Sequence, residues 1–125
     1  VSATTCAVKK QYPNRTLIAC LELHTYSSLN ENFIKEYRNS LNFADEVIVF
    51  YSSKAIKIKR MKEISFDKIS EAFNHYNLEV FNNSSFFEEF LKSKNYINTN
   101  LLLMSSGNFG GLDFESLKND VKNKF

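Results

Sequence analysis

Four short apolar runs, separated by segments with helical spacing of apolar residues, limit what this chain can fold into. The runs span residues 16–23, 46–51, 78–81 and 100–104. Such short and nearly continuous apolar runs are typical of strands that are buried on both faces of a sheet. Their alternation with helices predicts a three-layer, Rossmann-like α/β fold: an open, mostly parallel sheet with helices on both faces.

The segments between the runs carry apolar residues at steps of three and four, which is the spacing of one face of a helix. The stripes are Leu29, Phe33, Tyr37 and Leu41; Phe66, Ile69, Ala72, Phe73 and Tyr76; Phe86, Phe87, Phe90 and Leu91; and Phe114, Leu117 and Val121. We therefore expect four helices after the first run.

Local signals also indicate where these helices begin. Ser28 and Ser85 are each followed three residues later by glutamate, which is the spacing of a capping box. Ser65 and Asp113 are each flanked by apolar residues at the spacing of a hydrophobic staple. These four residues are the expected helix caps.

Residues 1–12 form another helical segment, ended by Pro13, with no strand before it. A crossover helix normally joins two strands of the same sheet. We therefore expect residues 1–125 to be a single domain cut from a longer polypeptide just after a missing first strand.

Charge and composition exclude some classes of partner. The 16 basic and 14 acidic residues leave a net charge of +2, too balanced to favour nucleic acid or an anionic membrane as the main partner. No apolar run reaches the length that crosses a bilayer, and we expect a cytoplasmic protein without a membrane or nucleic-acid partner. Cys6 and Cys20 lie in apolar stretches without metal-binding spacing, which favours buried free thiols.

The turns after the predicted strands are the places to search for a site, because open α/β sheets bind ligands beyond the carboxyl ends of their strands. His24, Thr25, Tyr26 and Ser27 follow the first strand and precede a predicted helix start, which favours an anion such as a carboxylate. The alternative is structural: His24 bonds a neighbouring carbonyl group and Tyr26 packs on the core.

Two further turns stand out. The stretch "SSGNFGG", residues 105–111, holds all three glycines, so its backbone requires positive φ angles or a close approach to another group. It could instead be a long turn that redirects the chain, and it matches neither the dinucleotide fingerprint nor a Walker A loop. The basic stretch at residues 51–62 could steer an anionic substrate, but an exposed connection whose lysines face water is favoured.

Several catalytic motifs do not occur in the sequence. There is no Gly-x-x-x-x-Gly-Lys-[Ser/Thr] loop, no Gly-x-Ser-x-Gly elbow and no His-Glu-x-x-His pair. The other histidine, His75, is expected at the surface near a helix end. By themselves, the residues support an α/β ligand-binding domain.

Three motifs extend this interpretation: "YPNRTLIACLELHTYSSLNENF", "ADEVIVFY" and "LLLMSSGNFGGLD". In this order and spacing they resemble the C-terminal domain of Mur ligases, in the branch that contains UDP-N-acetylmuramate:L-alanine ligase and the murein tripeptide ligase. The resemblance implies an enzyme that uses ATP and Mg²⁺ to activate a carboxylate, which an incoming amine then attacks. It also implies that ATP, the metal and UDP-N-acetylmuramate are bound mainly by other domains, including a central ATPase domain. This domain would help to bind the incoming amino acid or peptide and close over the ATP site.

The resemblance also implies which residues bind the substrate. The turn that begins at His24 matches the family's His-Arg-Tyr-Ser-Arg pattern, with Thr25 and Ser28 at the two arginine positions. Hydroxyl groups cannot replace a bidentate arginine clamp on a carboxylate, so a peptide-accepting ligase is favoured over simple L-alanine addition. The expected substrate-binding residues are His24, Thr25, Tyr26, Ser27, Ser52, Lys54, Ser106, Gly107 and Asn108.

Two alternatives stay open at the level of sequence. The chain could be a stand-alone, non-catalytic α/β domain that binds a small ligand. It could also belong to another ligase of the superfamily, such as a folylpolyglutamate synthase or cyanophycin synthetase, although the turn at His24 argues against this.

Overall fold

The computed structural model describes residues 1–122 and contains a four-stranded sheet in which all neighbouring strands are parallel. The strands are β1 (Thr16–Glu22), β2 (Glu46–Phe50), β3 (Leu78–Phe81) and β4 (Thr99–Met104), in the order β3-β2-β1-β4. Each predicted strand is present, with bounds that differ by no more than one residue. The predicted strand positions are thus confirmed.

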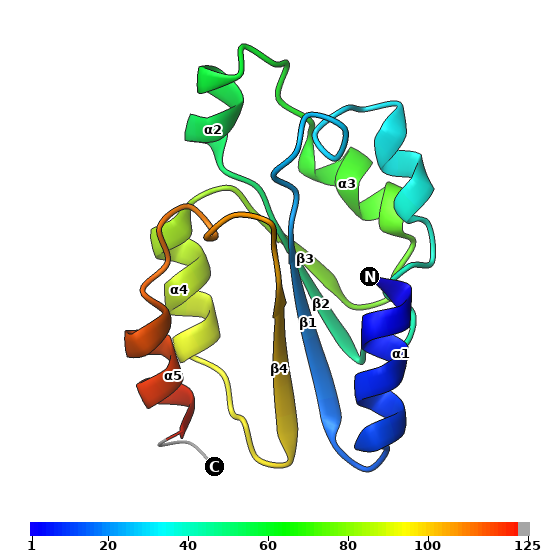
Figure 1. Ribbon diagram of the computed structural model, residues 1–125, viewed down its shortest axis with the longest axis vertical. Coiled ribbons are helices and arrows are strands. Elements are labelled where there is room, and N and C mark those ends of the chain that lie inside the picture. The colour runs from blue at the N-terminus through cyan, green and yellow to red at the C-terminus, as the bar shows by residue number, and fades with distance from the viewer. Residues whose placement is uncertain (123–125) are drawn as a thin grey trace.

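Helices cover both faces of the sheet, which confirms the predicted three-layer α/β fold (Figure 1). The 3₁₀ helix η1 (Phe33–Tyr37) lies with α1 (Ser2–Gln11) and α3 (Phe66–Phe73) on one face. α4 (Ser84–Lys92) and α5 (Phe114–Lys122) lie on the other. The short helix α2 (Ser53–Ile58) projects beyond the carboxyl end of the sheet.

Two apolar cores lie on the two sides of β1, whose side chains alternate between them. Leu17 and Ala19 pack into the core that contains α3. Ile18 and Cys20 pack into the core that contains α4. Because β1 is buried on both faces, it reads in the sequence as a continuous apolar run rather than as an alternating one.

A carboxylate ties α1 to the sheet. Asp45 Oδ2 accepts hydrogen bonds from Lys9 Nζ and from the Leu17 backbone N–H, both at 2.7 Å. Partial burial alone would raise the pKa of Asp45, but these two hydrogen bonds and the charge of Lys9 hold it below its ordinary value. The contact therefore holds α1 against the amino end of β1.

The stripe from Leu29 to Leu41 does not form the predicted α-helix. The segment is a series of turns around η1, although Leu29, Ile34 and Leu41 are buried as a helix face would be. The side-chain Oδ1 of Asn30 accepts the Asn32 N–H at 2.8 Å, and Asn39 has a left-handed backbone conformation. Such side-chain bonds to the backbone compete with helix formation.

Both predicted capping boxes are wrong. Ser28 Oγ donates to the Thr25 carbonyl at 3.0 Å instead of capping a helix. The cap of α4 is Asn83, whose Oδ1 accepts backbone N–H bonds from Ser85 and Phe86. Asparagine is as good a cap as serine, so the helix begins before the predicted position.

The caps predicted from hydrophobic staples are confirmed. Ser65 Oγ accepts the Lys68 N–H at 3.2 Å, and Asp113 Oδ1 accepts the Ser116 N–H at 3.0 Å. In the basic stretch 51–62, helix α2 was not predicted, but its lysines are largely exposed as expected for a connection.

The remaining sequence predictions have mixed outcomes. Both cysteines are free thiols; Cys20 is buried, whereas Cys6 is only half-buried. His75 is also half-buried, with Nε2 2.8 Å from the Ala44 carbonyl oxygen, and not fully at the surface. Within residues 1–122, no helix is long and apolar enough to cross a membrane.

Candidate functional site

The order of the strands places a crevice at the carboxyl ends of β1 and β4. The chain leaves β1 toward the η1 side of the sheet and leaves β4 toward the α5 side, so the two following loops diverge. Such a switch point is where open α/β sheets bind ligands. The turn at His24 and the glycine-rich loop, residues 105–111, both begin here.

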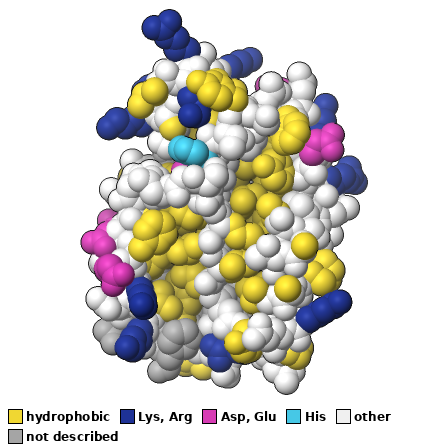
Figure 2. Space-filling view, in the orientation of Figure 1, with side chains coloured by type: hydrophobic (Ala, Val, Ile, Leu, Met, Phe, Trp, Pro, Cys, Tyr) yellow, Lys and Arg dark blue, Asp and Glu magenta, His cyan; other side chains and the backbone are white. Residues whose placement is uncertain are grey.

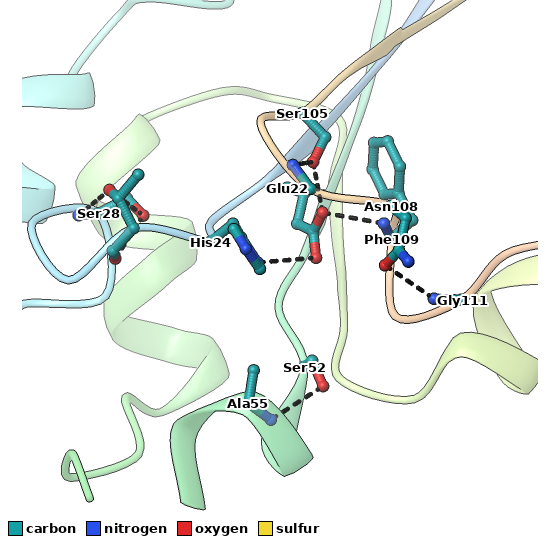
Figure 3. A network of polar contacts seen from close by, with 11 residues as sticks. Glu22, His24, Ser28, Ser52, Ala55, Ser105, Asn108, Phe109 and Gly111 are labelled. Carbon is teal, nitrogen blue, oxygen red and sulfur yellow. Dashed lines mark hydrogen bonds and ion pairs between the residues drawn. The ribbon is translucent and has the colours of Figure 1, made fainter. Parts of the chain in front are cut away.

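Glu22, the last residue of β1, joins these two segments. Its Oε1 accepts hydrogen bonds from the Ser105 hydroxyl group and, at 2.9 Å, from the Phe109 backbone N–H (Figure 3). Its side chain is only 1% exposed. A buried carboxylate is costly unless hydrogen bonds satisfy it, and here the donors come from the loop after β4. Glu22 thereby fixes that loop against the end of β1.

The glycine-rich loop has an ordered internal structure. Gly107 N–H donates to Ser105 Oγ at 2.8 Å, and Gly111 N–H donates to Asn108 Oδ1 at 3.1 Å. Phe109 is buried in the core, where its ring stacks on Phe87 with centroids 5.3 Å apart. Two contacts thus hold the loop in place: the Phe109 ring in the core and the Glu22 carboxylate.

The concentration of glycine in this loop has the two structural reasons that the sequence indicated. Gly110 has a φ of +68°, a conformation that other residues rarely adopt. A Cβ atom on Gly107 would lie 3.0 Å from Glu22 Oε1 and equally close to the His24 ring. The loop can therefore pass close to both side chains only because residue 107 is glycine.

His24 projects from the end of β1 toward the crevice. Its Nδ1 lies 3.7 Å from Glu22 Oε2, and its side chain is 38% exposed. Within residues 1–122 its ring makes no hydrogen bond to a carbonyl group, and the group that faces it is the Glu22 carboxylate. The imidazole is thus available to a ligand on its exposed side.

A cavity of about 330 Å³ occupies this end of the sheet. Of the predicted site residues, the structure brings together His24, Ser52, Lys54 and Asn108; the remaining lining residues are Glu22, Ala55, Ile58, Gly110 and Gly111. These residues come from the end of β1, from the segments that follow β1 and β4, and from helix α2 and its cap after β2. Basic side chains gather at this α2 end of the molecule (Figure 2).

Other predicted site residues do not line the cavity. Thr25 Oγ1 accepts the Ser28 N–H at 3.1 Å, and Tyr26 is exposed with Lys59 Nζ 4.9 Å from its ring centroid. Ser27 and Ser106 are exposed and are not among the residues that line the cavity. Gly107 contributes by its close approach to His24 rather than as part of the wall.

Sequence reasoning missed Glu22, which is the central residue of the arrangement. The sequence feature that could have indicated it is a single charged residue, Glu22, between Leu21 and Leu23 in an otherwise apolar run. Charged residues are rarely buried unless they are paired or hydrogen-bonded. Its hydrogen-bond partners could not be assigned, because they are 83 and 87 residues away along the chain.

A larger hollow of about 470 Å³ lies between η1 and α3, away from the strand ends. Its charged residues have both signs, and Glu31 and Lys68 form an ion pair across it. The hydrogen bond from Lys68 lowers the pKa of Glu31. The floor is apolar, with Ile34 and Ala72. This is a mixed, solvated surface groove.

The residues of the cavity do not match a resident metal site. Within residues 1–122, no cluster of three or more His, Cys, Asp or Glu side chains is placed to hold a metal ion. One carboxylate, one imidazole and one ammonium group instead converge with hydroxyl and amide groups around the cavity. Such a set can recognise a small polar ligand with charges of both signs.

The fold and the crevice together define an α/β domain with a ligand-sized site at the switch point of its sheet. No family model matches the chain. A murein peptide ligase, mpl, from Psychrobacter arcticus 273-4 has a similar structure, with a TM-score of 0.71 and 15% sequence identity over 98% of this chain. The chain spans only 25% of that protein.

A second similar structure is a domain ascribed to a UDP-N-acetylmuramate:L-alanyl-gamma-D-glutamyl-medo-diaminopimelate ligase from Haemophilus ducreyi 35000HP. It matches 95% of this chain and 80% of that domain, with a TM-score of 0.59 and 15% identity. At this level of identity, the two similarities confirm a fold like that of the Mur ligase C-terminal domain.

Proposed function

We propose that this chain is the C-terminal domain of an ATP-dependent amide ligase that joins an amino acid or a peptide to UDP-N-acetylmuramate. The domain helps to bind the incoming amino acid or peptide and closes over the ATP site, in peptidoglycan synthesis or recycling. The observation that supports this proposal best is the cavity at the switch point, which unites His24, Ser52, Lys54 and Asn108. The similarity of the fold to two ligases of this pathway supports it as well.

The chemistry of the cavity agrees with a role in substrate binding rather than in ATP binding. A glycine-rich loop that cradles phosphates presents several free backbone N–H groups. In the loop 105–111, the N–H groups of Gly107, Phe109 and Gly111 are already bonded to Ser105, Glu22 and Asn108. We therefore assign ATP and Mg²⁺ mainly to domains outside this chain.

Closure of such a domain would exclude water from the reaction. An acyl phosphate hydrolyses in water, so an enzyme that forms one gains by shielding it until the amine attacks. The exposed, basic helix α2 stands at the rim of the cavity, where it would face the ATPase domain. The isolated chain should accordingly show no ATP-dependent ligation, and detectable ligation by it would contradict this division of labour.

The first test is steady-state kinetics of the full-length enzyme with the His24→Ala substitution. We expect KM for the amine substrate to rise about tenfold, since one polar contact is worth roughly 1–1.5 kcal/mol, while KM for ATP changes little. The matched control is His75→Ala, because His75 contacts the Ala44 carbonyl far from the cavity and should leave both KM values unchanged. A change confined to the KM for ATP would refute the assigned role of His24.

The gene itself offers a second test. In-frame sequence upstream of Val1 should encode a histidine-bearing hinge motif and, further upstream, a Gly-Lys-[Ser/Thr] loop. A start codon close to Val1 would instead favour the stand-alone ligand-binding domain.

A further inference from the structure

The two oxygens of the Glu22 carboxylate have different surroundings. Oε1 is held by Ser105 and Phe109, whereas Oε2 points away from the loop and faces His24 (Figure 3). The distance of 3.7 Å from Oε2 to His24 Nδ1 is longer than a hydrogen bond. Glu22 is also one of the residues that line the cavity. One oxygen of this buried side chain is therefore directed at the site, and no donor of residues 1–122 lies within hydrogen-bond distance of it.

A carboxylate oxygen in this position favours a cationic donor. Buried carboxylates are stable when each oxygen accepts hydrogen bonds or faces a positive charge. Two other side-chain oxygens around the cavity already accept backbone hydrogen bonds: Ser52 Oγ accepts the Ala55 N–H, and Asn108 Oδ1 accepts the Gly111 N–H. Among the side-chain oxygens that line the cavity in residues 1–122, Glu22 Oε2 is the one that accepts no such bond and carries the charge of a carboxylate.

Resting on the proposed function, we propose that Glu22 Oε2 binds the free ammonium group of the incoming amino acid or peptide. The ammonium group would lie between the carboxylate and the open part of the cavity, beside the His24 ring. Hydrogen bonds between two charged groups are about twice as strong as neutral ones, so this contact discriminates a free amine from a blocked one. Glu22 is then a specificity-determining residue as well as the anchor of the loop.

The two roles of Glu22 use different oxygens and can be separated. In Glu22→Gln, the amide oxygen can still accept from Ser105 and Phe109, which preserves the loop. The amide NH₂ group then takes the place of Oε2, where it donates hydrogen bonds and carries no charge. A purely structural Glu22 would leave peptide binding unchanged by this substitution.

The experiment is an NMR titration of the ¹⁵N-labelled 125-residue chain with L-alanyl-L-alanine and with N-acetyl-L-alanyl-L-alanine. Both probes carry the same carboxylate, and only the first carries an ammonium group. The free dipeptide should shift the amide signals of residues 22–24 and 105–111, and the acetylated one should bind at least tenfold more weakly. Glu22→Gln should remove this preference, whereas Glu89→Gln, an exposed glutamate on α4, should retain it.

Each outcome decides something different. Equal binding of the two probes by the unmodified chain would overturn ammonium recognition but leave the cavity as a substrate site. Binding of neither probe at these residues would overturn both the ammonium contact and the substrate-binding role in the proposed function. If Glu22→Gln fails to fold, as judged by circular dichroism, the comparison of the two probes on the unmodified chain still tests the proposal.

Discussion

Removal of the Glu22 carboxylate is the sharpest test of how this end of the sheet is held together. In Glu22→Ala, the Ser105 hydroxyl group and the Phe109 N–H lose their common acceptor. Hydrogen bonds to a charged group contribute about 1.5–3 kcal/mol each, and a buried unpaired donor costs about 1–3 kcal/mol. The Phe109 N–H cannot turn to solvent, because its residue is 1% exposed and its ring is stacked in the core.

One effect opposes this loss. The variant no longer buries a carboxylate, whose desolvation costs several kcal/mol in the native protein. Breaking a buried pair by removing one partner is nevertheless destabilising in general, because the other partner is left behind. We therefore expect the free energy of unfolding to fall by about 2–4 kcal/mol in Glu22→Ala and by about 1 kcal/mol in Glu22→Gln, which keeps an acceptor oxygen.

The assay is urea unfolding followed by circular dichroism, together with hydrogen exchange of the Phe109 amide. Glu89→Ala is the control, because exposed substitutions usually change stability by no more than about 0.5 kcal/mol. Exchange at Phe109 should accelerate in Glu22→Ala well beyond the change in global stability. The reasoning fails if Glu22→Ala unfolds at the same urea concentration as the control.

Three further predictions concern contacts outside the site. Asp45→Asn should lower the free energy of unfolding by about 1 kcal/mol at neutral pH, after screening of its half-exposed pair with Lys9. The folded-state pKa of Asp45 is lowered, so its contribution to the free energy of unfolding is fully present above about pH 4 and is lost as the pH falls further. If the difference in stability between Asp45→Asn and the unmodified chain grew in acid, this prediction would be contradicted. Asn83→Ala should cost about 1 kcal/mol in thermal or urea unfolding, whereas Ser85→Ala should cost almost nothing, and the reverse result would restore Ser85 as the cap. Burial raises the pKa of the Cys20 thiol, so iodoacetamide should alkylate Cys20 only after unfolding. Equal labelling of Cys6 and Cys20 in the native chain would refute this.

The sequence was sufficient to predict the strands and the layers, because burial on both faces leaves a direct trace in composition. Residues 78–81 were placed without error, and the other strands differ by one residue at an end. Helix α3 was also found, since its apolar stripe and its Ser65 cap agree. Where local propensity and tertiary burial point the same way, sequence reasoning is reliable.

The errors arose where an apolar stripe was not accompanied by helical backbone. Leu29, Ile34 and Leu41 are buried, but Asn30 bonds to the local backbone and Asn39 has a left-handed conformation, and both favour turns. Helix α2 was missed for the opposite reason, since only Ile56 of its six residues is buried and no stripe is visible.

The candidate site could be located but not assembled from the sequence. The rule that ligands bind beyond strand ends identified the turns at His24 and at residues 105–111, and the structure places both at one crevice. What could not be predicted was the link between them, because hydrogen bonds over more than 80 residues depend on the strand order. That order became known only with the structure.

The same strand order has a consequence for how the chain folds during translation. β1 is an interior strand, yet one of its two neighbours is β4, paired from Thr16 with Thr99 to Leu21 with Met104. While residues 23–98 are being translated, the edge of β1 that will pair with β4 therefore has no partner. Such unpaired edges can accept strands from other chains. β4, the last strand to be translated, lies at the edge of the sheet and covers the open side of β1, so the sheet is complete only after nearly the whole domain has been translated.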